Sequence, residues 1–172
     1  MKPEPRSPQE IADLISKQFD RAEIPAIVKQ DLDVAQPWLE IRSHLLREVA
    51  TFLRDEPQLY FDYLSCLSGM DLGPEERKIG VVYHLMSIPH GHTIVLKCFI
   101  PRVTHPDNTI PSVAPVWLSA DWHEREAFDL LGIGFEGHPG LRRILMPNDW
   151  LGHPLRKDYV PADSYHGVKI AY

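Results

Sequence analysis

The chain has 172 residues, of which 44% are hydrophobic, and its formal net charge is −6. This length and composition predict one soluble domain with its own core, followed by a tail. The acidic balance argues against a general nucleic-acid binder, and no apolar run is long enough to cross a bilayer. The opening sequence MKPEPRSPQE lacks the apolar core of a signal peptide. We therefore expect a cytosolic protein that reaches a membrane only through its partners.

The N-terminal part predicts one helix and two strands. Residues 1–6 are rich in proline and are expected to be disordered. Ser7 is a predicted N-cap, with Pro8 at the first helical position and Glu10 at the third. Helical spacing then continues through four apolar residues, Ile11, Leu14, Ile15 and Phe19. Two strands are expected next, at residues 24–29 and 37–42.

The middle of the chain predicts a second helix and three more strands. The helix runs from about residue 44 to 54, with Ser43 as its cap and one apolar face formed by Leu45, Val49, Phe52 and Leu53. The strands are expected at 59–68, 78–87 and 93–101, and the last of them alternates, with Ile94, Leu96, Cys98 and Ile100 on one face. This order predicts an α+β fold in two layers, with helices on one face of a mixed five-stranded sheet (α-β-β-α-β-β-β).

The C-terminal part predicts short helices and then an extended arm. Residues 101–111 are expected to form a loop and residues 112–118 a short helix. Asp121 is a predicted cap of a further helix, with Glu124 completing a capping box, and this helix ends near Gly132. Proline and glycine are frequent after that point. We expect residues 7–133 to form the α+β domain and residues 134–172 to form an arm that docks on a partner.

Histidines and carboxylates in this region raise the question of a metal site. A zinc site needs three or four converging ligands, yet the chain has no HExxH motif. His138 and His153 each lie in a Gly-His-Pro sequence, which is better explained as a tight turn with a local hydrogen bond. A stand-alone metal-dependent hydrolase remains an alternative, and its candidate ligands and acid–base groups are His123, Glu124, Glu126 and His138.

Cofactor motifs are absent from the sequence. There is no Gly-rich nucleotide-binding motif and no P-loop. Cys66 and Cys98 are too few for an iron–sulfur cluster and are interpreted as core residues of a reduced compartment. Arg125 and Asp129 lie four residues apart on a predicted helix and are expected to pair, which would anchor the arm without a catalytic pocket.

Two basic pairs in the arm indicate a protein interface. Arg142-Arg143 and Arg156-Lys157 lie among leucine, isoleucine and aromatic residues, a composition typical of protein–protein contacts. Nucleic acid is disfavoured because the nearby Glu136, Asp149 and Asp158 oppose a net basic face.

The segment from residue 120 to 159 resembles the signature of the 30-kDa-type subunit of respiratory complex I. The matching pieces are Glu124-Arg125-Glu126, Phe128-Asp129-Leu130, Gly132-Ile133, Phe135-Glu136-Gly137-His138-Pro139, Leu141-Arg142-Arg143-Ile144-Leu145 and Leu155-Arg156-Lys157-Asp158-Tyr159. A weaker resemblance extends over nearly the whole chain, through Met70-Asp71-Leu72-Gly73 and the strand around His84. An ordered run of this kind is more specific than a single short motif.

The resemblance implies a role inside a larger enzyme. It implies a structural subunit, without a redox group or catalytic residue of its own, in the peripheral arm of a proton-translocating NADH–quinone oxidoreductase. FMN, iron–sulfur clusters and quinone would then be held by partner subunits, and the neighbours would be the 49-kDa-type subunit and iron–sulfur subunits at the cytoplasmic face of the inner membrane. A ferredoxin-dependent photosynthetic-type complex and a membrane-bound hydrogenase are the related alternatives. The interface residues implied by the signature are Glu124, Arg125, Glu126, Asp129, His138, Arg142, Arg143, Arg156, Lys157, Asp158 and Tyr159.

Overall fold

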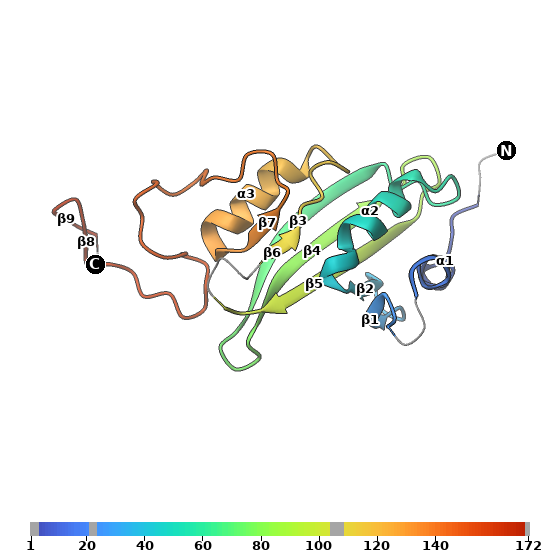
Figure 1. Ribbon diagram of the computed structural model, residues 1–172, viewed down its shortest axis with the longest axis horizontal. Coiled ribbons are helices and arrows are strands. Elements are labelled where there is room, and N and C mark those ends of the chain that lie inside the picture. Colours follow the sequence, from blue (N-terminus) through green and yellow to red (C-terminus); the bar gives the residue numbers. More distant parts are fainter. Residues whose placement is uncertain (1–3, 21–23, 104–108, 171–172) are drawn as a thin grey trace.

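The chain folds into a five-stranded sheet with helices packed against one face (Figure 1). In the computed structural model the described residues are 4–20, 24–103 and 109–170. The strands are β1 (Ile27–Asp31), β2 (Trp38–Ile41), β3 (Tyr63–Gly73), β4 (Lys78–Met86) and β5 (Thr93–Pro101). Their order is β1-β2-β5-β4-β3, and β2 pairs with β5 in parallel while the other neighbours are antiparallel. The predicted mixed α+β fold is therefore confirmed.

Helix α1 (Pro8–Phe19) begins as the sequence predicts. The backbone N–H of Glu10 donates to the Ser7 hydroxyl (3.3 Å), and the Ser7 N–H donates to the Glu10 carboxylate (2.8 Å), which completes a capping box. Just before the helix, the Arg6 N–H donates to Nδ1 of His92 (3.1 Å). The expectation of disorder over residues 1–6 falls partly on residues 1–3, which lie outside the described residues.

Helix α2 (Leu46–Asp55) starts in a different way from the prediction. A 3-10 turn, η1 (Ser43–Leu45), precedes it, and the N-cap residue of the helix is Leu45, which makes no side-chain capping hydrogen bond. The predicted cap at Ser43 is therefore wrong, because the chain enters α2 through a tightened turn. The helix buries Leu46, Val49, Ala50 and Leu53.

The core lies between these helices and one face of the sheet. Alternate residues of β5, which are Ile94, Leu96, Cys98 and Ile100, are buried and oppose Leu85, Tyr83, Val81 and Ile79 of β4. The face predicted for residues 93–101 is therefore the face that packs into the core. Cys98 is buried there as expected, whereas Cys66 is exposed, so the prediction of two core cysteines is wrong for Cys66.

Strand β3 begins and ends later than predicted. Residues 59–62 form the entry to the strand, where the Phe61 N–H donates to the Leu53 carbonyl (2.9 Å) and Nε1 of Trp117 donates to the Phe61 carbonyl (2.8 Å). At its other end β3 continues to Gly73, which pairs with Lys78 across the hairpin to β4. Glycine and aspartate are infrequent in strands, but β4 pairs with this stretch along its length and thereby extends the strand.

Helix α3 (Ala120–Leu131) is framed by a second, small sheet. Strands β6 (Thr109–Pro111) and β7 (Gly134–Glu136) pair in parallel on either side of it in the chain. The expected loop at 101–111 is therefore wrong for residues 109–111, while its residues 104–108 lie outside the described residues. The expected short helix at 112–118 is wrong. The Ser112 N–H donates to the Glu136 carbonyl (2.9 Å), and the residues that follow form turns before α3.

Beyond β7 the arm is extended, and it ends in a small hairpin. Strands β8 (Ser164–Tyr165) and β9 (Val168–Lys169) are joined by His166 and Gly167, whose φ angles are +47° and +79°. Two successive positive φ angles are typical of the tight turn that matches strand twist. Within the described residues, none of the helices has the length and apolar character needed to cross a bilayer.

Candidate functional site

The candidate site is α3 together with the arm that runs along it (Figure 1). The helix follows Ser119, which makes no side-chain cap bond, and stops at Gly132, whose φ of +70° is left-handed. The capping box predicted from Asp121 and Glu124 is wrong, because the Glu124 side chain is fully buried and faces the protein. Glu124 therefore bonds to another segment of the chain instead of capping the first turn of α3.

Glu124 joins α3 to the segment that leaves β6. Its carboxylate accepts hydrogen bonds from the Ser112 hydroxyl (2.6 Å) and from the Val113 N–H (2.7 Å). Burial raises the pKa of Glu124 to about 7, against the opposing effect of these two donors. A carboxyl with such a pKa could exchange a proton near neutral pH, but its side chain has 0% exposure, so no substrate can reach it. Its geometry is that of a structural clamp.

Asp129 fixes the arm to α3. Its buried carboxylate accepts hydrogen bonds from the N–H groups of Ile144 (3.0 Å), Leu145 (2.7 Å) and Met146 (2.8 Å). It also pairs with the guanidinium of Arg143 at 2.7 Å. Burial alone would raise the pKa of Asp129, yet these donors outweigh it and hold the pKa below its usual value. The carboxylate therefore remains charged at neutral pH and orders the arm around it.

Arg125 does not pair with Asp129, so that prediction is wrong. Its guanidinium lies over the ring of Trp122 at 4.7 Å, and its Nε donates to the Arg142 carbonyl at 3.4 Å. Asp129 lies one helical turn away but turns toward Arg143, which approaches from the arm. Sequence spacing alone could not show this, because the competing cation comes from a different segment.

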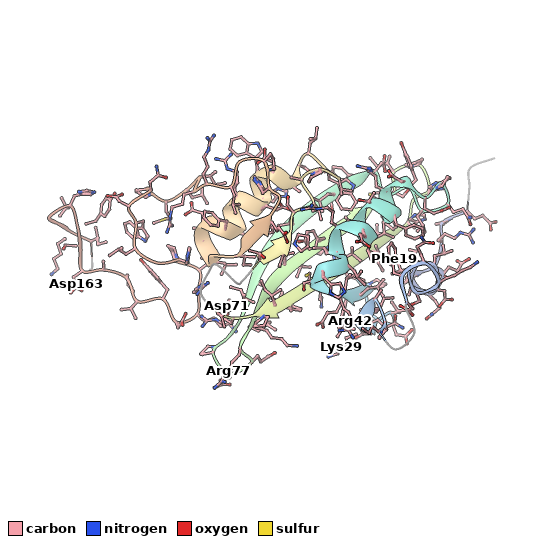
Figure 2. The ribbon with its side chains drawn as sticks, viewed as in Figure 1. Phe19, Lys29, Arg42, Asp71, Arg77 and Asp163 are labelled. Atoms are coloured by element: carbon pink, nitrogen blue, oxygen red, sulfur yellow. The ribbon has the colours of Figure 1, made fainter. Side chains whose placement is uncertain are left out.

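The arm is fastened a second time at the end of the sheet, where Figure 2 labels Asp71. The Asp71 carboxylate accepts from the Lys157 N–H (2.9 Å) and from Nε and Nη2 of Arg102 (2.7 and 3.0 Å). The Arg102 guanidinium also pairs with Asp158. Although burial opposes it, this set of donors lowers the pKa of Asp71 to about 2. Sequence reasoning missed Asp71 and Arg102 as site residues, although Asp71 lies in the weaker part of the family resemblance.

The predicted local hydrogen bond is present at His138, whereas His153 bonds to α3, 24 residues earlier in the chain, so that prediction is wrong for His153. The Gly140 N–H donates to Nδ1 of His138 (3.0 Å), so Nε2 of that ring is the nitrogen that donates to the Asp121 carbonyl (3.1 Å). Nδ1 of His153 lies 2.9 Å from the Asp129 carbonyl. Among the described residues, no three or more His, Cys, Asp and Glu side chains are arranged to hold a metal ion.

The arm also supplies donors to the last turn of α3. The Leu155 N–H donates to the Leu130 carbonyl (3.0 Å), and Nε of Arg156 donates to the Leu131 carbonyl (2.7 Å). Gly132 lies against this contact, since a Cβ added there would be 2.5 Å from Nε2 of His153. The glycine thus permits both the left-handed turn and the close passage of the arm.

The remaining predicted interface residues lie toward solvent. Glu126, Arg142 and Lys157 are exposed, and Tyr159 is half-buried with its hydroxyl accepting from Nε1 of Trp150 (3.0 Å). Several large apolar side chains of α3, of the turn before it and of the arm are also exposed; they are Leu118 (87%), Trp122 (63%), Leu145 (60%), Leu151 (82%), Leu155 (61%) and Val160 (82%). Such a concentration of exposed apolar side chains is typical of a surface that a partner covers.

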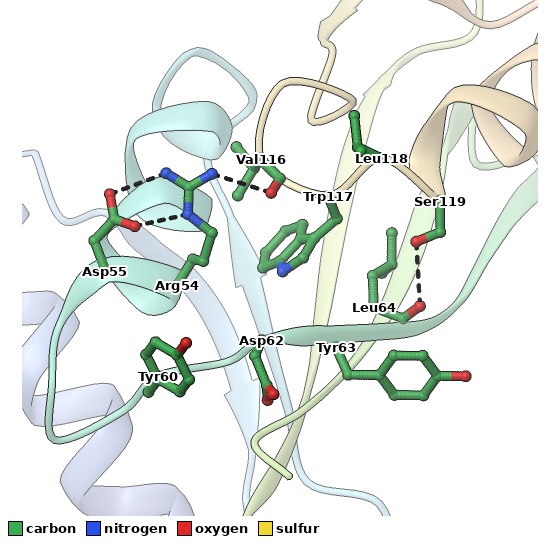
Figure 3. Close-up of a pocket in the computed structure, with 10 residues that line it drawn as sticks. All are labelled: Arg54, Asp55, Tyr60, Asp62, Tyr63, Leu64, Val116, Trp117, Leu118 and Ser119. Atoms are coloured by element: carbon green, nitrogen blue, oxygen red, sulfur yellow. Dashed lines mark hydrogen bonds and ion pairs between the residues drawn. The ribbon is translucent and has the colours of Figure 1, made fainter. Parts of the chain in front are cut away.

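An open groove of about 540 Å³ lies where α2 meets the turn before α3 (Figure 3). Tyr60, Tyr63 and Leu118 line it and are exposed, while Arg54 pairs with Asp55 (2.7 Å) and donates to the Val116 carbonyl (3.1 Å). Arg54 and Asp55 are thus already paired with each other, and the carboxylate of Asp62 accepts from the Ile88 N–H (2.9 Å). Nothing in this arrangement resembles a nucleophile with its base.

Comparison with known proteins agrees with the family resemblance. The family model for the 30 kDa subunit of respiratory-chain NADH dehydrogenase matches residues 39–165. An NADH-quinone oxidoreductase subunit of Chlorobium phaeobacteroides is 51% identical over 149 residues, which cover 86% of this chain and 87% of that protein. The subunit of the same name from Chloroherpeton thalassium is 51% identical over 125 residues, which cover 72% of this chain but only 50% of the longer relative.

The fold is also found in a solved structure. A chain from the membrane-bound sulfane sulfur reductase, an archaeal respiratory membrane complex, superposes with a TM-score of 0.69 over 90% of this chain and 86% of that chain, at 24% sequence identity. At this identity the similarity establishes a common fold.

Proposed function

Because the chain belongs to the family of the 30 kDa subunit of respiratory-chain NADH dehydrogenase, we propose that it is a structural subunit of an NADH–quinone oxidoreductase. In this proposal the partner subunits hold FMN, the iron–sulfur clusters and quinone and perform the electron transfer. The chain contributes a folded surface on which the complex assembles, at the cytoplasmic side of the membrane, and it contacts the membrane only through the complex.

The observation that supports this proposal best is the two-sided character of the arm. Its inner side is fixed to the chain's own α3 through Asp129 and to the sheet through Asp71. Its outer side exposes Leu151 and Val160, each at 82%. An arm that is ordered from within yet apolar toward solvent fits a docking role, because a partner would remove that apolar area from water.

We further propose that this surface meets the 49-kDa-type subunit and the neighbouring iron–sulfur subunits. The polar part of the surface would come from Glu126, Arg142 and Lys157, whose side chains are exposed. The guanidinium groups of Arg143 and Arg156 are engaged by carbonyls of the chain itself, so their role is to shape the arm that the partner recognises.

The test is a pair of substitutions on the outer side of the arm. Leu151→Asp combined with Val160→Asp should weaken assembly by at least about 100-fold, since burial of two aliphatic side chains contributes roughly 3 kcal/mol or more. The variant would be expressed in a strain that lacks the subunit, and the amount of assembled enzyme and the NADH–quinone activity of membranes would be measured.

Ile88→Asp is the matched control, because Ile88 is also exposed (60%) but lies in the turn between β4 and β5, away from the arm. The control should assemble normally. Normal assembly of the arm variant, in cells where deletion of the subunit abolishes the enzyme, would contradict the proposed docking role.

A further inference from the structure

The two edges of the main sheet differ in how they are protected. Edge strand β1 is short, has a register irregularity between Ile27 and Lys29, and presents that lysine to solvent. These are the features by which proteins block unwanted strand pairing. Edge strand β3 is much longer, and from Cys66 to Met70 it contains no charged residue and no proline. Its pairing with β4 is regular from Cys66 to Asp71.

The free part of the β3 edge has defined ends. At one end the Ser119 hydroxyl donates to the Leu64 carbonyl (3.5 Å; Figure 3). At the other end Nζ of Lys157 donates to the Leu72 carbonyl (3.4 Å). Between them, among the described residues, the outer backbone groups of residues 65–70 have no hydrogen-bond partner from another segment. A row of unpaired N–H and C=O groups of this kind is a template for an added strand.

A groove of about 400 Å³ runs beside this free edge. It is lined by Cys66 and Ser68 from the open face of β3 and by Leu67 and Gly69 from the covered face, which is possible only at the edge of the strand. The opposite wall is α3, which approaches closely: a Cβ added to Gly69 would lie 2.4 Å from Cδ1 of Leu131. The groove is thus a slot between an edge strand and a helix.

The α3 wall indicates what kind of strand the slot accepts. Ala127 and Leu130 make its middle apolar, together with Leu155 of the arm, whose N–H donates to the Leu130 carbonyl. Glu126 and His123 lie on the same α3 wall. Glu126 is exposed and, within the part of the chain that the structure describes, forms no ion pair. An added strand would direct alternate side chains into the slot, so apolar residues suit its centre and a lysine or arginine suits Glu126.

We propose that an extended segment of another subunit of the enzyme complex, apolar with one basic residue, adds to the edge of β3 at residues 65–70 and fills the slot beside α3. This inference rests on the proposed function, since it takes the partner from the same complex. Backbone pairing would supply the contact, and the slot would supply selectivity for alternate side chains.

Hydrogen exchange of backbone amides in the isolated chain and in the purified complex tests this proposal. Amides within residues 65–70 that face outward should exchange on the order of tenfold or more slowly in the complex, because each gains a hydrogen-bond partner. Amides of β1 at residues 28–30 serve as the internal control and should change little. Equal exchange of residues 65–70 in both states would overturn the proposal while leaving the assignment to the complex intact.

Charge reversal provides the second arm of the test. Glu126→Lys should reduce incorporation of the chain into the complex by roughly tenfold, because it places like charges opposite each other. Glu76→Lys is the control, since it makes the same charge change in the turn between β3 and β4, outside the slot, and should have no effect. Equal incorporation of the two variants would count against a basic strand. If residues 65–70 of the isolated chain become protected as its concentration rises, two copies of the chain pair there, which would overturn the proposal. A chain that enters no complex would refute the proposed function and this inference together.

Discussion

Replacement of Asp129 should release the arm from α3. The carboxylate is fully buried and accepts hydrogen bonds from three consecutive N–H groups, those of residues 144–146, as well as from Arg143. In Asp129→Ala all of these donors lose their acceptor, and the guanidinium loses its counter-charge in a partly buried position. Loss of one partner of a buried ion pair typically costs about 3–5 kcal/mol. For a chain of this size that corresponds to a decrease in Tm of about 6–20 °C.

Thermal unfolding of the purified chain, followed by circular dichroism, measures this effect, and limited proteolysis shows whether the arm becomes accessible. Asp149→Ala is a suitable control, since Asp149 is an exposed carboxylate of the same arm that bonds to the Tyr165 hydroxyl (2.8 Å). The control should change Tm by less than about 2 °C, because contacts of exposed groups contribute little. An Asp129→Ala variant with the Tm and the cleavage pattern of the wild type would refute the argument that this carboxylate organises the arm.

Three further outcomes are expected. The pKa of Glu124 is raised from 4.5 to about 7 in the folded state, so the folded protein holds a proton that the unfolded chain releases. The stabilisation from this proton is complete below about pH 4.5 and is lost as the pH rises through 7. Glu124→Gln should reduce this pH dependence of the unfolding free energy by up to about 3 kcal/mol, as measured by denaturant titrations over that range. Because the folded pKa of Asp71 is lowered to about 2, its contribution is present above about pH 4 and is lost as the pH falls toward 2, and Asp71→Asn should remove that part of the acid-induced loss. Gly69→Val should reduce stability by about 1–3 kcal/mol through its clash with Leu131, whereas Gly140→Ala, which meets nothing within 4 Å, should leave it unchanged within experimental error.

The sequence predicted the elements whose signal is local. The capping box of Ser7 and Glu10 was correctly identified because its two residues lie within one helical turn. The alternation in β5 was equally readable, since one face of that strand meets the core. Five strands in a mixed sheet followed from their order, and the structure confirms it.

The errors concern contacts between distant segments. Strands β6 and β7 are each three residues long and pair only with each other, so neither has a periodicity to read. Asp129 was assigned to Arg125 because they are four residues apart, but a cation from the arm lies closer in space. Glu124 was assigned to a capping box because it follows Asp121 by three residues, but its donors lie in the segment after β6. Spacing within one helix cannot show which of several possible partners a carboxylate binds, because partners from distant segments come close only in the folded chain.

The donors that complete the last turn of α3 have a consequence for the order of events during synthesis. The carbonyls of Asp129, Leu130 and Leu131 receive their hydrogen bonds from residues 143–156, which the ribosome makes after the helix. A nascent chain ending soon after Gly132 therefore has a hydrated, frayed helix end and no ordered outer surface. Only a chain whose arm has been translated can close the helix. Incompletely translated chains thus lack the ordered arm that other subunits would bind. Only fully translated chains can therefore enter the complex.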